Sequence, residues 1–399
     1  MKMKKNLLKI LLIAICLAAA SPAYCLNIIP TWDSSITNDP NAAAITNGIM
    51  FAIKTTESNI VDNLTVQIYF QEMSGGLGES DTYYFPVSYS SYLTALKNSA
   101  SSVNDSNALS QLPNSSTDPV VGNSQINLQF PQAHLFGFYS GYGGTDGYDS
   151  TISLNTSAMN FTRPPANSGK YDLIATAEHE MDEVLGFVST LPGNYPSGPI
   201  GPMDLFRYAT NLVPNLVLNR TYTTSGDNAF FSVDGTNLLA RFNMMAGGDY
   251  HDFWSASALW APPGVTPYPQ VQDAYAYPNT APNLGSNELA GLDIVGYTLA
   301  VPPPLLKIVL SGKNKFTLSW AGGGNGYMLQ ENTNLLASGS WVNSASGTTN
   351  PTMIISTNII KFYRLYKLLP PAPLIAQSAT SQSSRNVVFQ KVRHVYNPN

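Results

Sequence analysis

The segment from Tyr171 to Gly186 carries the residues whose types and spacing could bind a metal ion. His179 and Glu183 are four residues apart, so on a helix their side chains share one side. An imidazole and a carboxylate placed in this way can bind one Zn²⁺. Glu180, directly after the histidine, could take a proton from a water activated by the metal. It could later return that proton to a leaving amine. The spacing therefore predicts metal-assisted hydrolysis.

The same segment predicts a helix from Asp172 to Leu185, with Gly186 as the residue that ends it. At about 100° per residue, one stripe covering roughly a third of the circumference is apolar. Its members are Leu173, Ile174, Ala177, Met181, Val184, Leu185 and Val188. His179 and Glu183 lie about opposite this stripe, so we expect them to face an open cleft while the far side of the helix packs in the core.

Acidic residues are unusually dense in this segment. The chain has 25 Asp and Glu among 399 residues, yet Glu178, Glu180, Asp182 and Glu183 follow one another closely. They surround one of only four histidines, and such a group of carboxylates repels itself unless a cation is present. The HExxE pattern alone is weak, because acidic residues also crowd exposed helix faces for solubility. The scarcity of carboxylates elsewhere favours the metal site.

The segment resembles the active-site helix of zincin metalloproteases, which usually reads HExxH and, in the metzincin branch, HExxHxxG. Here Glu183 replaces the second histidine, and Ser189 stands at the position of the third metzincin ligand. The chain is also similar to a family of secreted bacterial metalloproteases in which this helix reads HExxEVxG. Further ordered blocks carry that likeness, which spans about residues 28–297: Met203 to Tyr208, Ala229 to Gly235, Gly247 to Tyr250, and Glu288 to Tyr297.

This resemblance implies a metallopeptidase and leaves the third metal ligand open. Asp204 is the first candidate, because it follows the helix by one loop and lies in a block that the family shares; it could equally be a loop or cap carboxylate. His251 is the second candidate, although its position does not match the family pattern. We expect His134 and His394 to be incidental. Arg207, Tyr208 and Tyr250 could steady an oxyanion, but a structural role is the better interpretation for each.

The pattern of the remaining chain predicts an α+β fold in several parts. We expect a signal peptide in 1–25, a zincin-like domain in 26–299, a proline-rich linker in 300–306, a small all-β sandwich in 307–367 and a disordered tail in 368–399. Within the large domain, expected helices are 41–56, 90–100 and 287–296; expected strands are 64–70, 82–87, 135–139, 151–154 and 230–233, with a polar loop over 101–124.

The N-terminus predicts export, because four lysines precede an apolar run from Ile10 to Ala20 and small residues from Ser21 to Ala23. We therefore expect a secreted protein, extracellular or periplasmic, with no transmembrane segment after cleavage. Loss of the four lysines takes the net charge from -5 to -9. An acidic chain without a basic cluster argues against a nucleic acid partner.

The expected function is zinc-dependent hydrolysis of peptide bonds, with His179, Glu183 and Asp204 as ligands of Zn²⁺ and Glu180 as general base. The expected partner is a peptide or protein substrate. One alternative is a secreted adhesion or binding protein that keeps the scaffold without turnover, and another is a Ca²⁺ site. The C-terminal domain could contact carbohydrate or a cell surface through exposed aromatic residues, although Trp320 and Trp341 are more readily interpreted as core.

Overall fold

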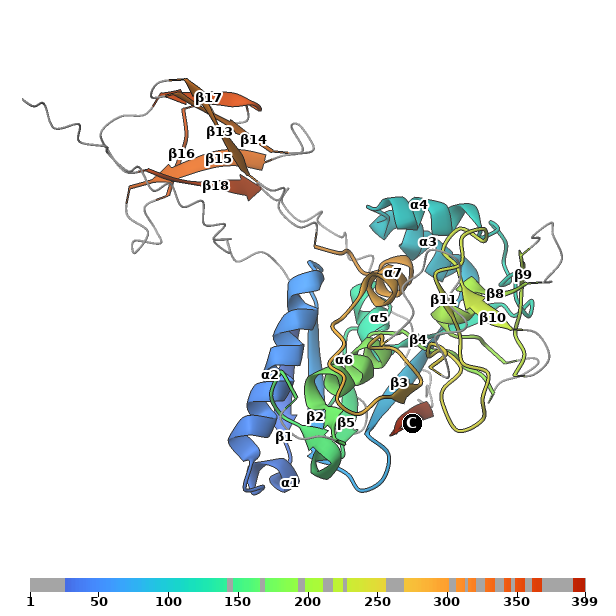
Figure 1. Ribbon diagram of the computed structural model, residues 1–399. Coiled ribbons are helices and arrows are strands. Elements are labelled where there is room, and N and C mark those ends of the chain that lie inside the picture. Colours follow the sequence, from blue (N-terminus) through green and yellow to red (C-terminus); the bar gives the residue numbers. More distant parts are fainter. Residues whose placement is uncertain are drawn as a thin grey trace, which may run out of the picture. The chain divides into compact units, whose positions relative to one another are not determined.

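The computed structural model describes residues 26–141, 146–165, 169–192, 198–210, 218–224, 228–255, 269–300, 306–312, 315–320, 327–333, 341–345, 349–355, 361–367 and 390–398 (Figure 1). The expected signal peptide and most of the expected linker lie outside these residues, as does the first part of the expected tail, 368–389. None of the described helices combines the length and the apolar character that a membrane span requires.

The chain divides into two compact units, and the boundary falls between Ala300 and Val301. The larger unit contains Tyr24–Ala300 together with Thr380–Asn399, and the smaller unit contains Val301–Ala379. The described end of the chain therefore belongs to the unit that carries the candidate metal-binding helix.

The larger unit is built on a seven-stranded mixed sheet, in which five strands come from the first half of the chain. Three run parallel: β1 (Asn27–Trp32), β2 (Thr65–Glu72) and β5 (Ser150–Leu154). The long strand β3 (Gly78–Ser88) pairs antiparallel with β5 through its first half. Its second half pairs with β4 (Gln125–Gln129).

The last strand of the sheet comes from the C-terminus. β19 (Gln390–Pro398) pairs antiparallel with β3, from Gln390 opposite Tyr84 to Tyr396 opposite Gly78. It is the red strand beside β3 in Figure 1, and it pairs in turn with β12 (Tyr275–Ala276). The expectation of a disordered tail is therefore wrong for these nine residues. A short polar segment gains order because the edge of β3 offers it backbone hydrogen-bond partners.

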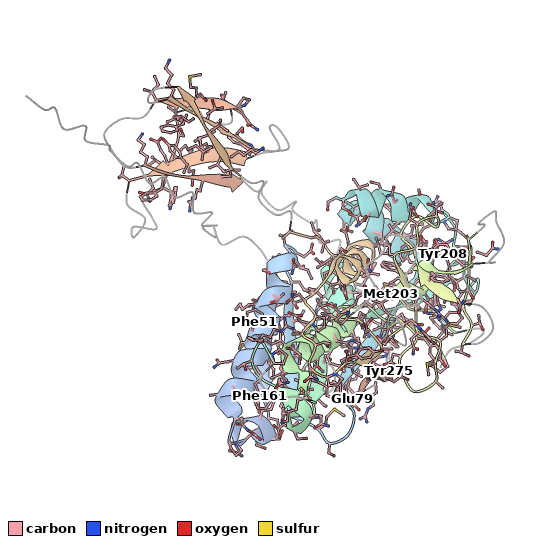
Figure 2. All side chains as sticks on the ribbon, in the orientation of Figure 1. Phe51, Glu79, Phe161, Met203, Tyr208 and Tyr275 are labelled. Atoms are coloured by element: carbon pink, nitrogen blue, oxygen red, sulfur yellow. The ribbon has the colours of Figure 1, made fainter. Side chains whose placement is uncertain are left out.

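Two long helices pack together beside this sheet. α2 (Ala42–Asn59) packs on α6 (Leu173–Val184), and α6 also contacts β3 and β5. Apolar side chains of all these elements form one continuous core, which fills the larger unit (Figure 2). The predicted helix over 172–185 is confirmed, and the predicted helix over 41–56 is confirmed with a longer C-terminal end.

The remaining helices of the described residues are short. They are α1 (Ser34–Thr37), α3 (Tyr89–Ser99), α4 (Val103–Ser110), α5 (Phe130–Leu135) and α7 (Ser286–Ile294). α3 and α7 confirm the predictions over 90–100 and 287–296. The expected loop over 101–124 contains α4, which Ser102 and Asp105 cap. The strand expected over 135–139 is wrong, because α5 ends there and a turn follows.

Short strands follow α6. Four of them form an antiparallel sheet: β8 (Arg207–Thr210), β9 (Leu218–Arg220), β10 (Ala229–Phe231) and β11 (Ala240–Arg241). Before α6, β6 (Met159–Asn160) pairs with β7 (Tyr171–Asp172). Two 3₁₀ turns cover Thr156–Ala158 and Pro202–Phe206.

The smaller unit consists of two three-stranded antiparallel sheets. One contains β13 (Lys307–Gly312), β14 (Lys315–Ser319) and β17 (Thr352–Ile355), and the other β15 (Tyr327–Asn332), β16 (Val342–Asn343) and β18 (Phe362–Lys367). A small core of Leu306, Leu318, Trp320 and Leu329 joins them. With helices and sheets combined in this way, the described chain is of mixed α and β structure, as the predicted α+β class requires.

Candidate metal centre

α6 begins and ends as its sequence predicts. The side chain of Asp172 accepts a hydrogen bond from the backbone N of Ala175 at 2.7 Å and caps the N-terminus. Gly186 takes a φ of +109°, a left-handed conformation that favours glycine and stops the helix. All twelve residues of α6 are buried. The expected open side is therefore covered, because tertiary neighbours pack around the whole helix.

Potential ligand atoms of His179, Glu183 and Asp252 lie within 4.8 Å of one another next to α6, and His251 contacts two of these residues. His179 Nε2 lies 3.6 Å from Glu183 Oε1 and 3.7 Å from Asp252 Oδ1. His251 Nε2 lies 2.8 Å from the same Glu183 oxygen and 3.5 Å from Asp252 Oδ1. We call His179, Glu183, His251 and Asp252 the central group. Ligands of a tetrahedral zinc with bonds of about 2.0–2.2 Å lie roughly 3.3–3.6 Å apart, so three of these four spacings are close to those of a zinc site.

Neighbouring groups fix the central group from outside. His179 Nδ1 is 2.9 Å from the carbonyl oxygen of Val271 and donates to it, since a carbonyl can only accept. Ser80 Oγ donates to Glu183 Oε2 at 2.7 Å, and Gln272 Nε2 donates to Asp252 Oδ1 at 2.9 Å. A histidine that donates through one ring nitrogen can present the other nitrogen to a metal. The donor set and its supports therefore fit a bound zinc ion.

The positive charges of the imidazoles and the negative charges of the carboxylates in the central group compensate one another. Burial opposes the charged form of His179, but the carboxylates of Asp252 and Glu183 outweigh it and raise its pKa to about 9. The same balance raises the pKa of His251 to about 9. Burial would raise the pKa of Glu183, yet hydrogen bonds from the two imidazoles hold it well below its ordinary value. Without a metal, two protons on imidazoles thus take the place of one divalent cation.

Glu180 lies beside this group and outside it. Its side chain is completely buried, and neither carboxylate oxygen has a hydrogen-bond donor among the described residues. Burial and then the nearby charge of Glu183 raise its pKa well above the ordinary value. Gly78 of β3 leaves the space that it occupies, because a Cβ there would collide with Glu180 Oε1. A buried carboxyl group with free oxygens can hold and release a proton.

A second set of ligand atoms shares Glu183 and His251. Together with Asp249 and His394, they offer atoms that all lie within 4.8 Å of one another. The ring of His394 lies edge-on to His251 with centroids 4.8 Å apart, and His394 Nδ1 lies 3.8 Å from Asp249 Oδ2. Contrary to the sequence-based expectation, β19 thus brings His394 next to the central group.

Asp204 lies outside both groups. It accepts hydrogen bonds from Ser189 Oγ at 2.5 Å, from Thr190 N at 3.1 Å and from Gly201 N at 2.9 Å. These contacts tie the loop after α6 to the 3₁₀ turn that contains Met203, a buried residue in the interior of the larger unit (Figure 2). The structure supports the loop-carboxylate interpretation of Asp204, and places His251 beside Glu183 and Asp252.

Arg207 acts on the site from a distance. It is buried, and its guanidinium donates to the carbonyl oxygens of Tyr250 at 2.5 Å and Asn243 at 3.5 Å. These bonds hold the loop that carries His251 and Asp252, so Arg207 is a positioning residue. Tyr208 faces Arg220 instead, whose guanidinium carbon lies 5.2 Å from its ring centre. His134 lies away from the central group, 4.0 Å from Asp149 Oδ1.

Sequence reasoning missed Asp252 and Gln272, and it set aside His394. A signal was present, because the chain has only four histidines, and His251 is followed directly by an acidic residue. The distance along the chain hid the rest, because Glu183 and His251 are 68 positions apart and His394 lies beyond the smaller unit.

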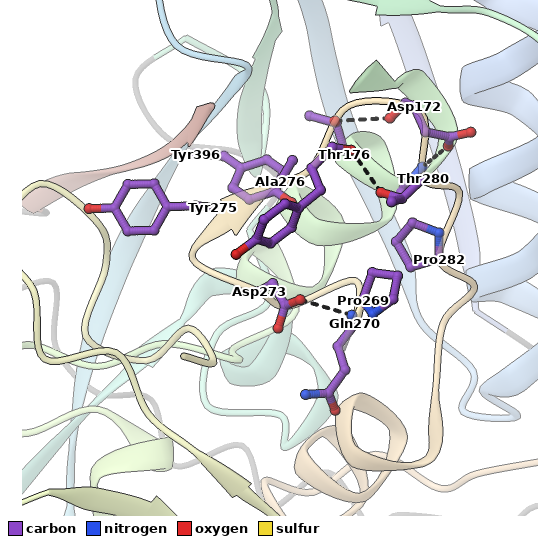
Figure 3. Close-up of a pocket in the computed structure, with 12 residues that line it drawn as sticks. Asp172, Thr176, Pro269, Gln270, Asp273, Tyr275, Ala276, Thr280, Pro282 and Tyr396 are labelled. Atoms are coloured by element: carbon purple, nitrogen blue, oxygen red, sulfur yellow. Dashed lines mark hydrogen bonds between the residues drawn. The ribbon is translucent and has the colours of Figure 1, made fainter. Parts of the chain in front are cut away.

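A small pocket runs along α6 on the side of its first turns (Figure 3). Thr176 of the helix, Asp273 and Tyr275 line it, and so does Tyr396 of β19. The ring of Tyr396 also stacks on the ring of His179, with centroids 3.9 Å apart and planes at 16°. One side chain of the C-terminal strand therefore lines the pocket and covers a residue of the central group.

No protein-family model, curated protein or solved structure matches this chain.

Proposed function

We propose that the larger unit is a zinc-dependent, zincin-like peptidase with His179, Glu183, His251 and Asp252 as metal ligands and Glu180 as general base. One observation carries this proposal. Atoms from α6 and from the loop at residues 251–252 lie close together in one buried place, and three of the four spacings between them are close to those of a tetrahedral site. Two imidazole nitrogens in the set favour zinc over calcium, which prefers oxygen ligands.

When bound there, zinc would act as a Lewis acid and bring the acidity of water close to neutral pH. The chain's own residues supply the remaining steps. Glu180 can take a proton during attack on the peptide carbonyl and give it to the departing amine nitrogen. Ser80 and Val271 keep Glu183 and His179 in the orientation for binding metal. Gly78 leaves the space in which the Glu180 carboxylate sits.

The alternative of a binding protein without turnover is favoured by one observation. Catalytic zinc sites keep one position open, whereas structural sites are closed by four protein ligands. Here four residues with potential ligand atoms lie close together, and none of the four exposes more than 1% of its surface. A site of that kind holds metal firmly but gives a substrate no access in the intact chain.

Two measurements on purified protein test the peptidase proposal: the zinc content and the cleavage of casein. We expect about one zinc per chain. Glu180→Gln should keep the metal and lose cleavage by about 100-fold or more, since it removes general base catalysis. Glu178→Gln is the matched control, because it is the same change at a buried glutamate outside the central group; it should retain cleavage.

The outcomes separate the two candidates. Protein that binds about one zinc per chain but cleaves no peptide of a library would favour the binding protein. The same result is then expected for variants in which the metal site has been uncovered. Protein that takes up no zinc would leave a buried ion-pair network and would refute both.

For the smaller unit we propose a β-sandwich with a structural role for its tryptophans. Two sheets share a core that includes Trp320, which is only 6% exposed. Trp341 is half-buried, with the Arg364 guanidinium 4.4 Å from the centre of its ring. Contact of this unit with carbohydrate or a cell surface stays a proposal, and so does export of the protein from the cell. Binding of the full chain to polysaccharide beads, lost in Trp341→Ala, would support the carbohydrate contact.

A further inference from the structure

We propose that β19 closes the metal centre of the intact chain: it covers the edge of β3, supplies His394 as a further metal ligand, and must move before a peptide can enter. This inference rests on the proposed peptidase function. It begins from the burial of the site, where His179, Glu180 and Glu183 are each 0% exposed. A substrate cannot reach such a site unless some segment leaves.

β19 is the segment whose departure would uncover it. Seven residues of β19 pair with Gly78 to Tyr84 of β3. β5 pairs with the same stretch, from Gly78 to Thr82, on the other side. Among the described residues, removing β19 would leave that second side of β3 as a free edge next to Gly78 and Ser80, which contact Glu180 and Glu183. An exposed strand edge of this kind binds extended peptides through backbone hydrogen bonds.

The side chains of β19 alternate as the strand geometry requires. Arg393 points outward, is largely exposed, and lies 3.2 Å from Glu79 Oε1 and 3.5 Å from Asp81 Oδ1 of β3. His394 and Tyr396, two residues apart, both point inward and are buried. These two inward side chains both reach the metal centre: Tyr396 stacks on His179, and His394 lies against His251.

His394 is placed and poised to bind a cation. It belongs to the set with Glu183, Asp249 and His251 whose ligand atoms lie within 4.8 Å of one another. Its Nε2 is buried and has no hydrogen-bond partner among the described residues. A buried imidazole nitrogen without a partner is costly unless something binds it. A metal shared with Glu183 would satisfy this nitrogen and fasten β19 in place.

We infer that movement of β19 would enlarge the pocket drawn in Figure 3, because Tyr396 of this strand lines it. Tyr396 lines this pocket and also lies on His179. With Tyr396 removed, the pocket along α6 would extend to the His179 ring. The strand edge, the pocket and the metal ligands would then form one continuous site for an extended peptide.

The test uses full-length protein and a fluorescein-labelled peptide with the sequence of residues 390–399, followed by fluorescence anisotropy. The variant Arg393→Glu places a negative charge opposite Glu79 and Asp81 and should loosen β19 without touching the core. We expect it to bind the labelled peptide at least about tenfold more tightly than the natural chain, in which the tethered strand competes at an effective concentration of up to about millimolar. Lys54→Glu on α2, an equal charge reversal at an exposed residue, should behave like the natural chain.

Two further experiments test whether His394 binds the metal and whether reversed charges on β3 restore the pairing of β19. A labelled peptide with His394→Ala should bind Arg393→Glu protein more weakly when zinc is present and equally when zinc has been removed. Glu79→Lys and Asp81→Lys, added to Arg393→Glu, should restore ion pairs between β19 and β3 and return the affinity for the labelled peptide to that of the natural chain. Casein cleavage should rise in Arg393→Glu, and a chain that ends at Phe389 should do the same if it folds.

The two hypotheses fail in different ways. If Arg393→Glu and the natural chain take up the peptide equally and cleave casein at the same rate, β19 does not close the site, although the peptidase stands. Should Arg393→Glu bind zinc and peptide without cleaving any substrate, β19 is the closing strand of a binding protein and the peptidase proposal fails.

Discussion

At the scale of single residues, the central group exchanges protons for metal. His179 and His251 share the carboxylates of Glu183 and Asp252, and each imidazole holds its proton up to a pKa of about 9. A zinc ion can bind these nitrogens only after both protons have left. The same residues therefore stabilise the metal-free fold at low pH and bind metal at high pH.

The first prediction concerns the pH dependence of zinc affinity. Since each imidazolium must release a proton below pH 9, the affinity should rise about tenfold per pH unit for each, or up to about 100-fold per unit from pH 6 to 8. Titration against a zinc chelator of known pH dependence measures this slope. His251→Ala should lower the slope by about one proton, and a slope near zero would contradict the assignment of both histidines.

The stability of the metal-free protein depends on pH in the opposite direction, because it falls as the pH rises. A histidine with a raised folded pKa adds stability below its ordinary pKa of 6.5, and that contribution disappears as the pH rises through about 9. Thermal melts should therefore show zinc stabilising the protein more at pH 8 than at pH 6.

The second prediction concerns Gly78. A Cβ at this position would meet the flexible end of Glu180 rather than backbone, so the carboxylate should move while the fold survives. We expect Gly78→Ala to lower casein cleavage by about 10- to 100-fold, as misplacement of a catalytic group by about 1 Å can do. Zinc content and melting temperature should stay close to those of the natural chain. Unchanged cleavage would show that Glu180 is not the base.

At the scale of elements, one helix and one loop form the site, and polar contacts outside it set their positions. α6 supplies His179, Glu180 and Glu183, and the loop that carries His251 and Asp252 is held by the buried guanidinium of Arg207. A third element, the loop after α6, is held in its described part by hydrogen bonds to Asp204, and Asp204 itself lies outside both sets of metal-ligand atoms.

The third prediction separates Asp204 from the ligands. Asp204→Ala would leave three buried donors without their acceptor, so it should lower the free energy of unfolding by about 3 kcal/mol. The additional stabilisation by zinc should be unchanged, because the metal site does not include this residue. Asp252→Ala is the comparison, and should lose most of the zinc-dependent stabilisation. Melts with and without zinc distinguish the two, and loss of zinc binding in Asp204→Ala would restore Asp204 as a ligand.

At the scale of the whole molecule, the chain leaves the larger unit and returns to it. Residues 301–379 form the smaller unit, and Thr380–Asn399 belongs again to the larger one. The smaller unit is therefore an insertion between the sheet and its own C-terminal strand, and each of its ends connects to the larger unit.

The fourth prediction follows from this connectivity. A protease recognition sequence in place of residues 301–305 allows the chain to be cut between the two units. Because β19 stays paired with β3, the fragments should elute together in gel filtration after cutting. Cut Arg393→Glu protein should separate more readily, since the strand has lost its ion pairs with Glu79 and Asp81. Free fragments from the natural chain would show that β19 does not hold them.

Local sequence patterns were sufficient to predict the helix α6 and the first two residues of the site. Helical spacing, the cap at Asp172 and the stop at Gly186 define α6, and the spacing of four residues places His179 and Glu183 together. Local patterns of this kind depend on neighbours within a few residues, so a single amino-acid sequence shows them directly.

The distant residues that complete the site became apparent from the three-dimensional structure alone. His251 and Asp252 come from an irregular loop, and His394 from a polar tail whose pattern is typical of disorder. Neither segment has a periodicity that would reveal its place, because their positions follow from backbone pairing with β3 and from the hydrogen bonds of Arg207. Asp204 stands closer in the chain, yet its carboxylate is used within its own loop. Long-range contacts fold the loops back onto α6, and a single sequence does not display such contacts. For this reason, the residues nearest to α6 in sequence are not those nearest to it in space.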